Sequence, residues 1–188
     1  MTEGAGGVPE QQLLPGKYAR VERERRFLLP GPPAPSAVTA TRRITDRYLV
    51  GTRLRLRRVE QPGGESQLKL TQKVAVAGPG AVQGLITNTY LSEAEYDLLA
   101  RLPAAVLTKT RFSLGELGVD VFDGDLRGLV LAEAEFAADE EARSFAPPAG
   151  CVAEVTDDAR FTGGSLVVAP RPELLGWLAE YGLYPAGE

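Results

Sequence analysis

Residues 53–57 read Arg-Leu-Arg-Leu-Arg, an alternation with a period of two. In a β-strand, successive side chains point to opposite faces of the sheet. The stretch therefore predicts a strand with one face of arginine and one of leucine. Such a strand is usually half in water, with its charged side chains solvated. A single segment of this kind decides little until its neighbours are considered.

Four other segments repeat this division into a charged face and a second, mostly apolar face. The residues predicted to share the charged faces are Glu22, Glu24 and Arg26; Lys69, Thr71 and Lys73; Lys109 and Arg111; and Glu133 and Glu135. Five such strands in a helix-poor chain leave few elements to cover the apolar faces. If those faces pack outward against the few helices and loops, the charged faces must line an interior. A closed β-barrel with a charged interior satisfies this condition.

Short alternating segments between turn residues predict a mainly β protein, either a sandwich or a barrel. The predicted strands are 18–29, 41–50, 52–59, 66–74, 84–91, 105–113, 118–122, 130–136 and 152–161. Helices are expected after the capping box Ser92-Glu93-Ala94-Glu95, over 139–145, and over 172–181. We expect residues 1–17 to form a flexible tail and residues 18–188 a single domain that includes the C-terminal helix.

Composition excludes several classes of function. The 188 residues contain no histidine, which removes Ser-His-Asp and Cys-His catalysis and the commonest transition-metal ligand. A metal would have to bind carboxylates, and oxygen ligands favour Mg²⁺ or Mn²⁺. One cysteine excludes an internal disulfide and suits a reducing cytoplasm, where we expect the protein to reside. No apolar run is long enough to span a bilayer, so no membrane association is expected.

The charge is unevenly spread along the chain. Residues 17–73 hold 14 Lys or Arg and 5 Asp or Glu, although the whole chain has a net charge of −4. The basic half suggests a polyanionic partner, or else the two halves neutralise each other in the fold. A chain of phosphates that carries a divalent cation would satisfy clustered arginines and clustered glutamates together.

The motifs resemble, in order, those of the CYTH, or triphosphate tunnel metalloenzyme, family. The stretch 22–28, Glu-Arg-Glu-Arg-Arg-Phe-Leu, resembles the family's opening ExExK signature. The later matches are Arg47-Tyr48-Leu49, Arg53-Leu54-Arg55, Lys69 with Lys73, Lys109-Thr110-Arg111-Phe112, Asp120-Val121-Phe122, Glu133-Ala134-Glu135-Phe136 and the segment 154–161. Each motif alone is weak, and their order over about residues 18–168 carries the resemblance.

The resemblance implies an eight-stranded antiparallel tunnel that hydrolyses a triphosphate, most simply inorganic tripolyphosphate, or a nucleoside or thiamine triphosphate. It implies Mg²⁺ or Mn²⁺ on Glu22, Glu24, Glu133 and Glu135, of which Glu24, Glu133 and Glu135 are the expected catalytic residues. The implied phosphate-binding residues are Arg26, Arg53, Arg55, Lys69, Lys73, Lys109 and Arg111. The physiological substrate, the preferred metal and the choice between monomer and homodimer stay open.

Two departures from the family pattern keep other functions in view. Arg26 replaces the lysine of ExExK, and the family's inward RxExE pattern is matched by Thr87, Thr89 and Leu91. Loss of an arginine and two acids makes a non-catalytic binder of polyphosphate or nucleotide the alternative, with an adenylate cyclase ranked lower. A nucleic-acid-binding barrel is disfavoured, because aromatic residues make up only 7% and stacking surfaces would be sparse.

Overall fold

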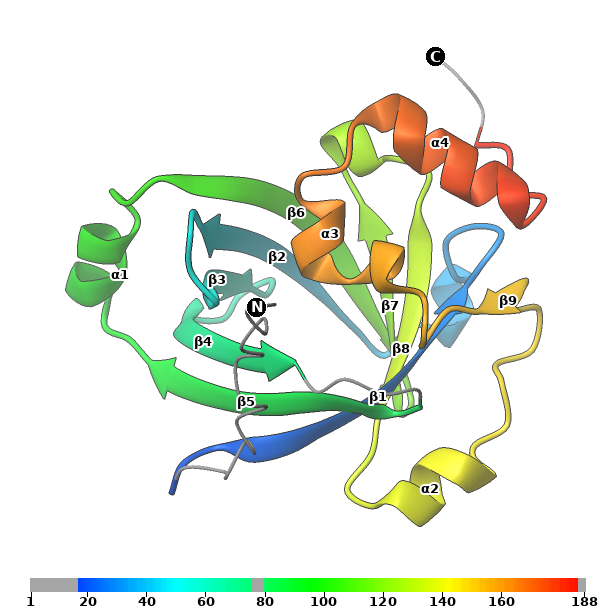
Figure 1. Ribbon diagram of the computed structural model, residues 1–188, viewed down its shortest axis with the longest axis horizontal. Coiled ribbons are helices and arrows are strands. Elements are labelled where there is room, and N and C mark those ends of the chain that lie inside the picture. Colours follow the sequence, from blue (N-terminus) through cyan, green and yellow to red (C-terminus); the bar gives the residue numbers. More distant parts are fainter. Residues whose placement is uncertain (1–16, 76–79, 186–188) are drawn as a thin grey trace, which may run out of the picture.

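The computed structural model describes residues 17–75 and 80–185, in which most of the chain forms one β-barrel (Figure 1). The strands are β1 (Arg20–Leu28), β2 (Ala40–Leu49), β3 (Leu54–Glu60), β4 (Gln67–Ala75), β5 (Val82–Tyr90), β6 (Ala104–Leu114), β7 (Leu117–Phe122), β8 (Val130–Glu135) and β9 (Ala153–Glu154). The helices are α1 (Glu93–Leu99), α2 (Asp139–Ser144), α3 (Gly163–Leu166) and α4 (Arg171–Glu180), with 3₁₀ turns η1 (Pro35–Ala37), η2 (Gly124–Leu126) and η3 (Ala159–Phe161).

The sheet runs in the order β5-β4-β3-β2-β6-β7-β8-β1-β9, and an additional β5–β1 pairing closes it. All of the pairings are antiparallel. Eight strands therefore form a closed barrel, and the two-residue β9 adds to its outside. The predicted eight-stranded antiparallel barrel is confirmed.

Strand β1 closes the barrel by changing partners along its length. Its first half pairs with β5, from Arg20 opposite Ile86 to Arg23 opposite Val82. Its second half pairs with β8, from Glu24 opposite Glu135 to Leu28 opposite Leu131. Beyond the end of the β5 pairing, the free edge of β1 takes up β9. One strand thus joins three others.

A bulge in β5 accompanies the closure. The register shifts between Glu22 and Arg23, where Glu22 faces Gly84 and Arg23 faces Val82, so that Gln83 is the extra residue. Gly84 has φ 142°, and a Cβ there would lie 2.2 Å from the carbonyl oxygen of Val74. Only glycine fits this close approach of β5 to β4. Beyond the bulge, β5 runs in regular register with β4 and places Ile86 opposite Lys73 and Asn88 opposite Thr71.

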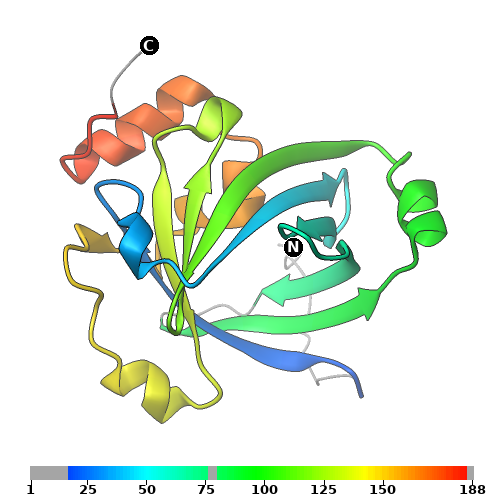
Figure 2. The ribbon, with the colours of Figure 1, turned by 180° about the vertical axis from the view of Figure 1, so that it is seen from behind.

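The outer faces of the strands are covered by short helices and loops, as the charge pattern predicted. Helix α1 places Tyr96 against Leu56 and Leu68 of β3 and β4. Its capping box is formed as expected, with Ser92 accepting a hydrogen bond from the Glu95 amide while the Glu95 carboxylate bonds back to the Ser92 amide. On the opposite side, the segment that contains α2 brings Phe145 onto Phe27 of β1. Figure 2 shows these covers from behind.

One end of the barrel is filled by apolar side chains. Leu28, Leu107, Phe122 and Leu131 point from the strands into a cluster that contains residues of η3, α3 and α4, such as Phe161. The remaining buried members of this cluster are Leu126, Leu129, Val155, Leu166, Leu174 and Leu178. The C-terminal segment therefore packs across this end, as Figure 1 shows for α3 and α4.

One expectation about the C-terminal part needed revision. The strand predicted over 152–161 is only Ala153–Glu154, after which the chain turns into η3. Its apolar residues pack from turns, since Val155 and Phe161 are both buried. The helices expected over 139–145 and 172–181 are present as α2 and α4. The predicted tail lies almost wholly outside the described residues. No helix of the described ranges is long and apolar enough to cross a membrane.

Candidate active site

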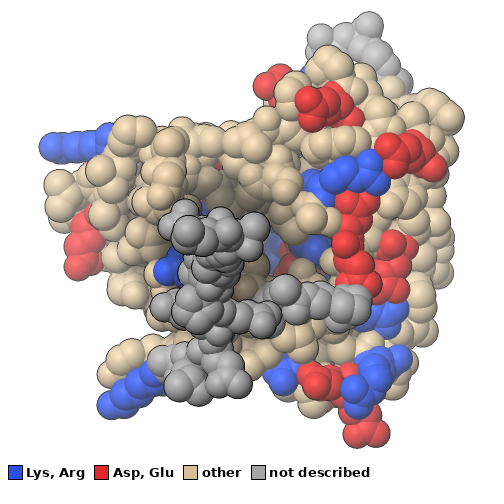
Figure 3. Space-filling view, in the orientation of Figure 1, with Lys and Arg blue, Asp and Glu red and all other residues tan. Residues whose placement is uncertain are grey.

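The barrel encloses a cavity of about 710 Å³. All eleven residues predicted from the sequence as catalytic, phosphate-binding or metal-binding line it: Glu22, Glu24, Arg26, Arg53, Arg55, Lys69, Lys73, Lys109, Arg111, Glu133 and Glu135. Lys and Arg side chains are visible in the hollow at the centre of the face in Figure 3. The structure thus brings the predicted residues together, while their individual roles stay predictions.

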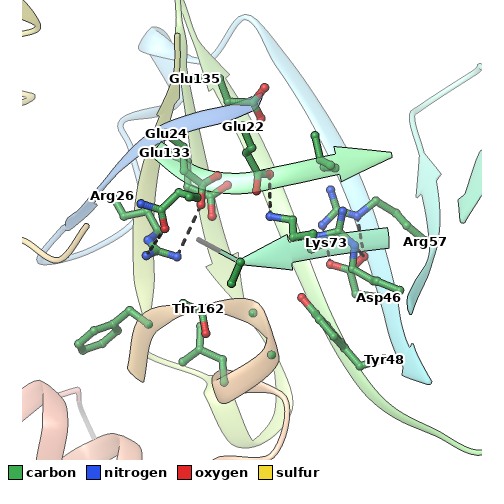
Figure 4. Close-up of a pocket in the computed structure, with 18 of the residues that line it drawn as sticks. Glu22, Glu24, Arg26, Asp46, Tyr48, Arg57, Lys73, Glu133, Glu135 and Thr162 are labelled. Carbon is green, nitrogen blue, oxygen red and sulfur yellow. Dashed lines mark hydrogen bonds and ion pairs between the residues drawn. The ribbon is translucent and has the colours of Figure 1, made fainter. Parts of the chain in front are cut away.

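One wall of the cavity is acidic and is built by β1 and β8. We call Glu22, Glu24, Glu133 and Glu135 the glutamate wall. The register places Glu24 opposite Glu135 and Glu133 opposite Arg26, so that the four carboxylates gather on one side (Figure 4). Lys73 reaches across from β4 to Glu22, with 2.6 Å between Nζ and Oε1.

Two carboxylates of this wall are buried with opposite consequences. Burial, followed by the charge of Glu133, raises the pKa of Glu24 to about 7. Glu133 is also buried, but Lys109 and Arg111 more than compensate and hold its pKa well below the usual range. Near neutral pH the wall therefore contains an ionised Glu133 beside Glu24. The negative charge of an ionised Glu24 is not fully balanced by the neighbouring cations. A cation near Glu24 would stabilise that form.

The donor chemistry of the glutamate wall fits a hard divalent cation such as Mg²⁺ or Mn²⁺, which binds oxygen ligands. Glu24 meets Arg26 only at 3.5 Å, so its negative charge is incompletely matched by protein groups. Among residues 17–75 and 80–185, however, no group of three or more acidic or cysteine side chains is already close enough to form a metal-binding set. The wall offers suitable oxygens, and further ligands would have to come from the bound anion or water.

The facing wall is basic and is built by β2, β3 and β4. We call Arg53, Arg55, Arg57 and Lys69 with the enclosed Asp46 the arginine wall. Asp46 is 1% exposed and accepts two hydrogen bonds from Arg57, at 2.5 Å from Nε and 2.6 Å from Nη2. Although burial opposes it, the charges of Arg57 and Arg55 hold the pKa of Asp46 well below its usual range.

Arg55 and Lys69 are less completely compensated than Arg57. The buried Nε of Arg55 has no hydrogen-bond partner in the described part of the chain, and it lies 3.6 Å from Asp46. Burial, followed by the charges of Arg57 and Arg55, lowers the pKa of Lys69 to about 8. An anion in the cavity would relieve this repulsion and satisfy the unpartnered N–H group.

Lys109 and Arg111 of β6 stand between the two walls. Both bind the fully buried Asp120 of β7, and Arg111 also binds Glu133. Asp120, which the sequence comparison singled out only as part of a motif, thus pairs with a lysine and an arginine. These contacts fix both cations at the edge of the glutamate wall.

Arg26 is directed to the seam where β1 leaves β5. Its Nη2 donates to the carbonyl of Thr156 at 2.7 Å and to the side chain of Gln83 at 3.0 Å. These bonds link β1 to the β5 bulge and to the turn after β9. Both bonds come from a single nitrogen, and a lysine ammonium also carries several donors, so these two contacts do not by themselves explain why arginine stands here.

The assignment of inward residues on β5 was wrong. Thr87 and Thr89 pair with Gln72 and Leu70, on the outer face, and Leu91 follows the strand and packs against the α1 cluster. The residues that line the cavity opposite Lys73 and Thr71 are Ile86 and Asn88. The unbroken register of residues 84–90 against β4 places these two on the same face as the inward lysines. The conclusion that this wall lacks charge still holds, with different residues.

Sequence reasoning also missed several residues. Asp46 received no role, Arg57 was placed on the arginine face without a function, and Tyr48 was noted only as part of a motif. All three line the cavity, and the Tyr48 hydroxyl lies so near Gly163 of α3 that a Cβ there would be 2.0 Å away. Arg160 pairs with Asp158 and Glu180, whereas Glu154 binds Arg25 and Asp157 accepts from the Gly80 amide.

Comparison with solved structures relates the chain to a triphosphatase. It is similar to the crystal structure of the inorganic triphosphatase NE1496, with 25% identity and a TM-score of 0.53, over 80% of this chain and 96% of that one. A second structure of NE1496, described as a hypothetical protein, matches equally, over 79% and 99% of the two chains. No protein-family model matches the chain, and no curated protein sequence does. The structural similarity confirms the resemblance to the CYTH, or triphosphate tunnel, family that the motifs predicted.

Proposed function

We propose that this protein hydrolyses a triphosphate with a divalent metal ion inside its barrel, and that inorganic tripolyphosphate is the first substrate to test. The observation that carries the proposal is the division of one cavity into a glutamate wall and an arginine wall. Similarity to an inorganic triphosphatase at 25% identity supports the same chemistry.

The charge of the cavity suits a highly charged anion. Ten Lys or Arg side chains line it against six Asp or Glu. Arg53, Arg55 and Lys69 would bind phosphate oxygens through charge-assisted hydrogen bonds, because no described residue neutralises them fully. Lys73, Lys109 and Arg111 would bind the part of the anion next to the glutamates.

Glu24, Glu133 and Glu135, with Glu22 close by, would hold Mg²⁺ or Mn²⁺. When bound, the metal neutralises charge on the phosphate oxygens and lowers the pKa of bound water. Glu133, held ionised by Lys109 and Arg111, or Glu135 beside it would orient the attacking water. Phosphoryl transfer needs mainly positioning and electrostatic stabilisation, so the absence of histidine is no obstacle.

The experiment is a phosphate-release assay with Mg²⁺ or Mn²⁺ on tripolyphosphate, ATP and thiamine triphosphate. Metal-dependent release that Glu133→Ala abolishes would support the proposal, and the best substrate would define the class. Glu93→Gln, which alters an exposed acid on α1, controls for the change of charge. Full activity in Glu133→Ala would contradict the assignment.

A binder without turnover is the second candidate, and the uncharged β5 wall favours it. Where the family pattern would place acids, Ile86 and Asn88 face the cavity. Tight tripolyphosphate binding by calorimetry with no phosphate release would establish this alternative. Ile86→Glu then asks whether one restored acid beside Lys73 brings back hydrolysis, with Thr87→Glu on the outer face as the matched control.

A further inference from the structure

The position of Asp46 is not explained by attraction of an anionic ligand. It lies inside the arginine wall, where its negative charge opposes the binding of any anion. It is 1% exposed, and Arg57 occupies both of its oxygens. A buried acid among anion-binding bases therefore calls for a function other than attraction.

The geometry points to that function. Arg57 uses Nε and Nη2 on Asp46, which fixes the plane of its guanidinium and leaves Nη1 for other contacts. Arg55, two residues along β3, lies on the same face with its Nε 3.6 Å from the same carboxylate oxygen. In the register of β3 with β4, Arg57 lies opposite Lys69 and Arg55 lies opposite Thr71, so that both arginines lie in the middle of the basic wall.

We propose that Asp46 is a positioning residue that holds Arg57 and Arg55 as a preset fork for the phosphates of the substrate. Arginine side chains lose rotamer freedom when they bind, and a partner that orders them beforehand removes that cost. Holding two like charges at adjacent inward positions also needs a nearby negative charge. The inference rests on the proposed function for the identity of the anion.

The test uses the sign of one effect. If Asp46 acted only through its charge, Asp46→Asn would add a net positive charge and tighten the binding of tripolyphosphate. If Asp46 positions the arginines, the same substitution weakens binding, by about tenfold, comparable to the loss of one charge-assisted hydrogen bond. Calorimetry in the presence of a chelator measures this without metal or turnover. Glu93→Gln serves as the charge-matched control away from the cavity.

A double-mutant cycle identifies the partner. In an Arg57→Gln background, Asp46→Asn should have a much smaller effect on affinity than in the wild type, because the residue through which it acts is gone. Equal effects in both backgrounds would contradict the proposal. Circular dichroism at the temperature of the titration verifies that each variant is folded, and the double variant removes both buried charges together.

A measurement without ligand separates this inference from the proposed function. In wild-type protein, the Nε–H signal of Arg57 in nitrogen-15 NMR should be resolved and slow to exchange, and that of an exposed arginine such as Arg101 should not be. Fast exchange of Arg57 would overturn the inference even if tripolyphosphate is hydrolysed. Slow exchange with weakened binding in Asp46→Asn would support it even if no hydrolysis occurs.

Discussion

The two walls of the cavity both contain a buried acid, and the two acids behave oppositely. Glu24 is 7% exposed and Asp46 is 1% exposed, so burial alone would raise the pKa of both. The pKa of Glu24 rises to about 7, because burial and Glu133 outweigh Lys73 and Arg26. The pKa of Asp46 falls, because Arg57 and Arg55 outweigh its burial.

This contrast shows which wall is complete within the protein. The arginine wall contains the counter-charge that orders part of it, and its remaining bases face the cavity. The glutamate wall has more negative charge than its neighbours compensate, so that a cation would complete it. A carboxylate at an inward strand position therefore orders the neighbouring arginines on one wall and is available to bind a cation on the other.

The largest effect is expected from Glu24→Gln. Removal of this carboxylate should lower metal-dependent phosphate release by about 1,000-fold, the scale of losing a major electrostatic contributor.

Without metal, the same change should raise the free energy of unfolding at pH 8 by about 1–3 kcal/mol, since it removes a poorly compensated buried charge. The raised pKa gives the sign: the penalty grows as pH rises through about 7 and is absent at pH 4. Thermal unfolding at both pH values tests this. A uniform loss of stability would mean that Glu24 is structurally satisfied.

The next largest effect is the opposite response of the arginine wall. Asp46→Asn should lower the free energy of unfolding by about 3–5 kcal/mol, because it leaves the buried Arg57 without its partner. Denaturant unfolding at pH 7 measures the change. Asp123→Asn, which alters an acid paired with the half-exposed Arg43, should cost less than about 1 kcal/mol. If the two variants cost the same, the contrast between buried and exposed pairs fails.

A smaller effect is expected for a single phosphate ligand of the arginine wall. Arg55→Gln should weaken tripolyphosphate binding by roughly 10- to 100-fold, as charged hydrogen bonds contribute about 1.5–3 kcal/mol. The unpartnered Nε of Arg55 is the reason to expect a ligand there. The outward-facing Arg58 provides the matched control, and Arg58→Gln should leave binding unchanged. Equal losses in both variants would indicate general charge attraction without a specific contact.

The smallest effect concerns pH. Lys69 has its pKa lowered to about 8, so it is protonated below that pH and loses its charge above it. Affinity for tripolyphosphate in the absence of metal should therefore fall roughly three- to tenfold between pH 7 and pH 9. A tenfold change corresponds to a difference of about one pKa unit between the free and the bound protein. Lys69→Arg keeps the charge and should flatten this profile. A profile of unchanged steepness would exclude Lys69 as its origin.

Most of the barrel could be predicted because alternation along each strand is a local property. Arg53, Arg55 and Arg57 face inward together, as do Glu133 and Glu135, and all of them line the cavity. The β5 wall could not be predicted in the same way. Both of its faces are uncharged, so alternation does not show which one is inward, and the pairing of β5 with β4 decides it.

The role of Asp46 was hidden for a similar reason. It lies among Thr45, Arg47 and other polar residues, where its sequence neighbourhood resembles an exposed edge. Its partner Arg57 is brought opposite only by the pairing of β2 with β3. The turn after β9 was likewise mistaken for a strand, because residues such as Val155 and Phe161 are buried without any ladder of hydrogen bonds.

The change of partners along β1 links the assembly of the cavity to the order in which the chain is made. Glu24 and Arg26 belong to the first strand described. The Arg26 carbonyl nevertheless accepts a hydrogen bond from the Val155 amide, and its guanidinium donates to the carbonyl of Thr156, 130 residues away in the sequence. On a ribosome, the first glutamates of the wall would wait for nearly the whole barrel to be synthesised before the seam beside them could form. Pairings so distant in sequence slow folding, because the chain loses the entropy of closing a long loop before the contacts that stabilise it can form. A nascent chain would therefore expose its charged strands for most of its synthesis. The alternating arginines and glutamates would oppose the association of these unpaired strand edges with other chains.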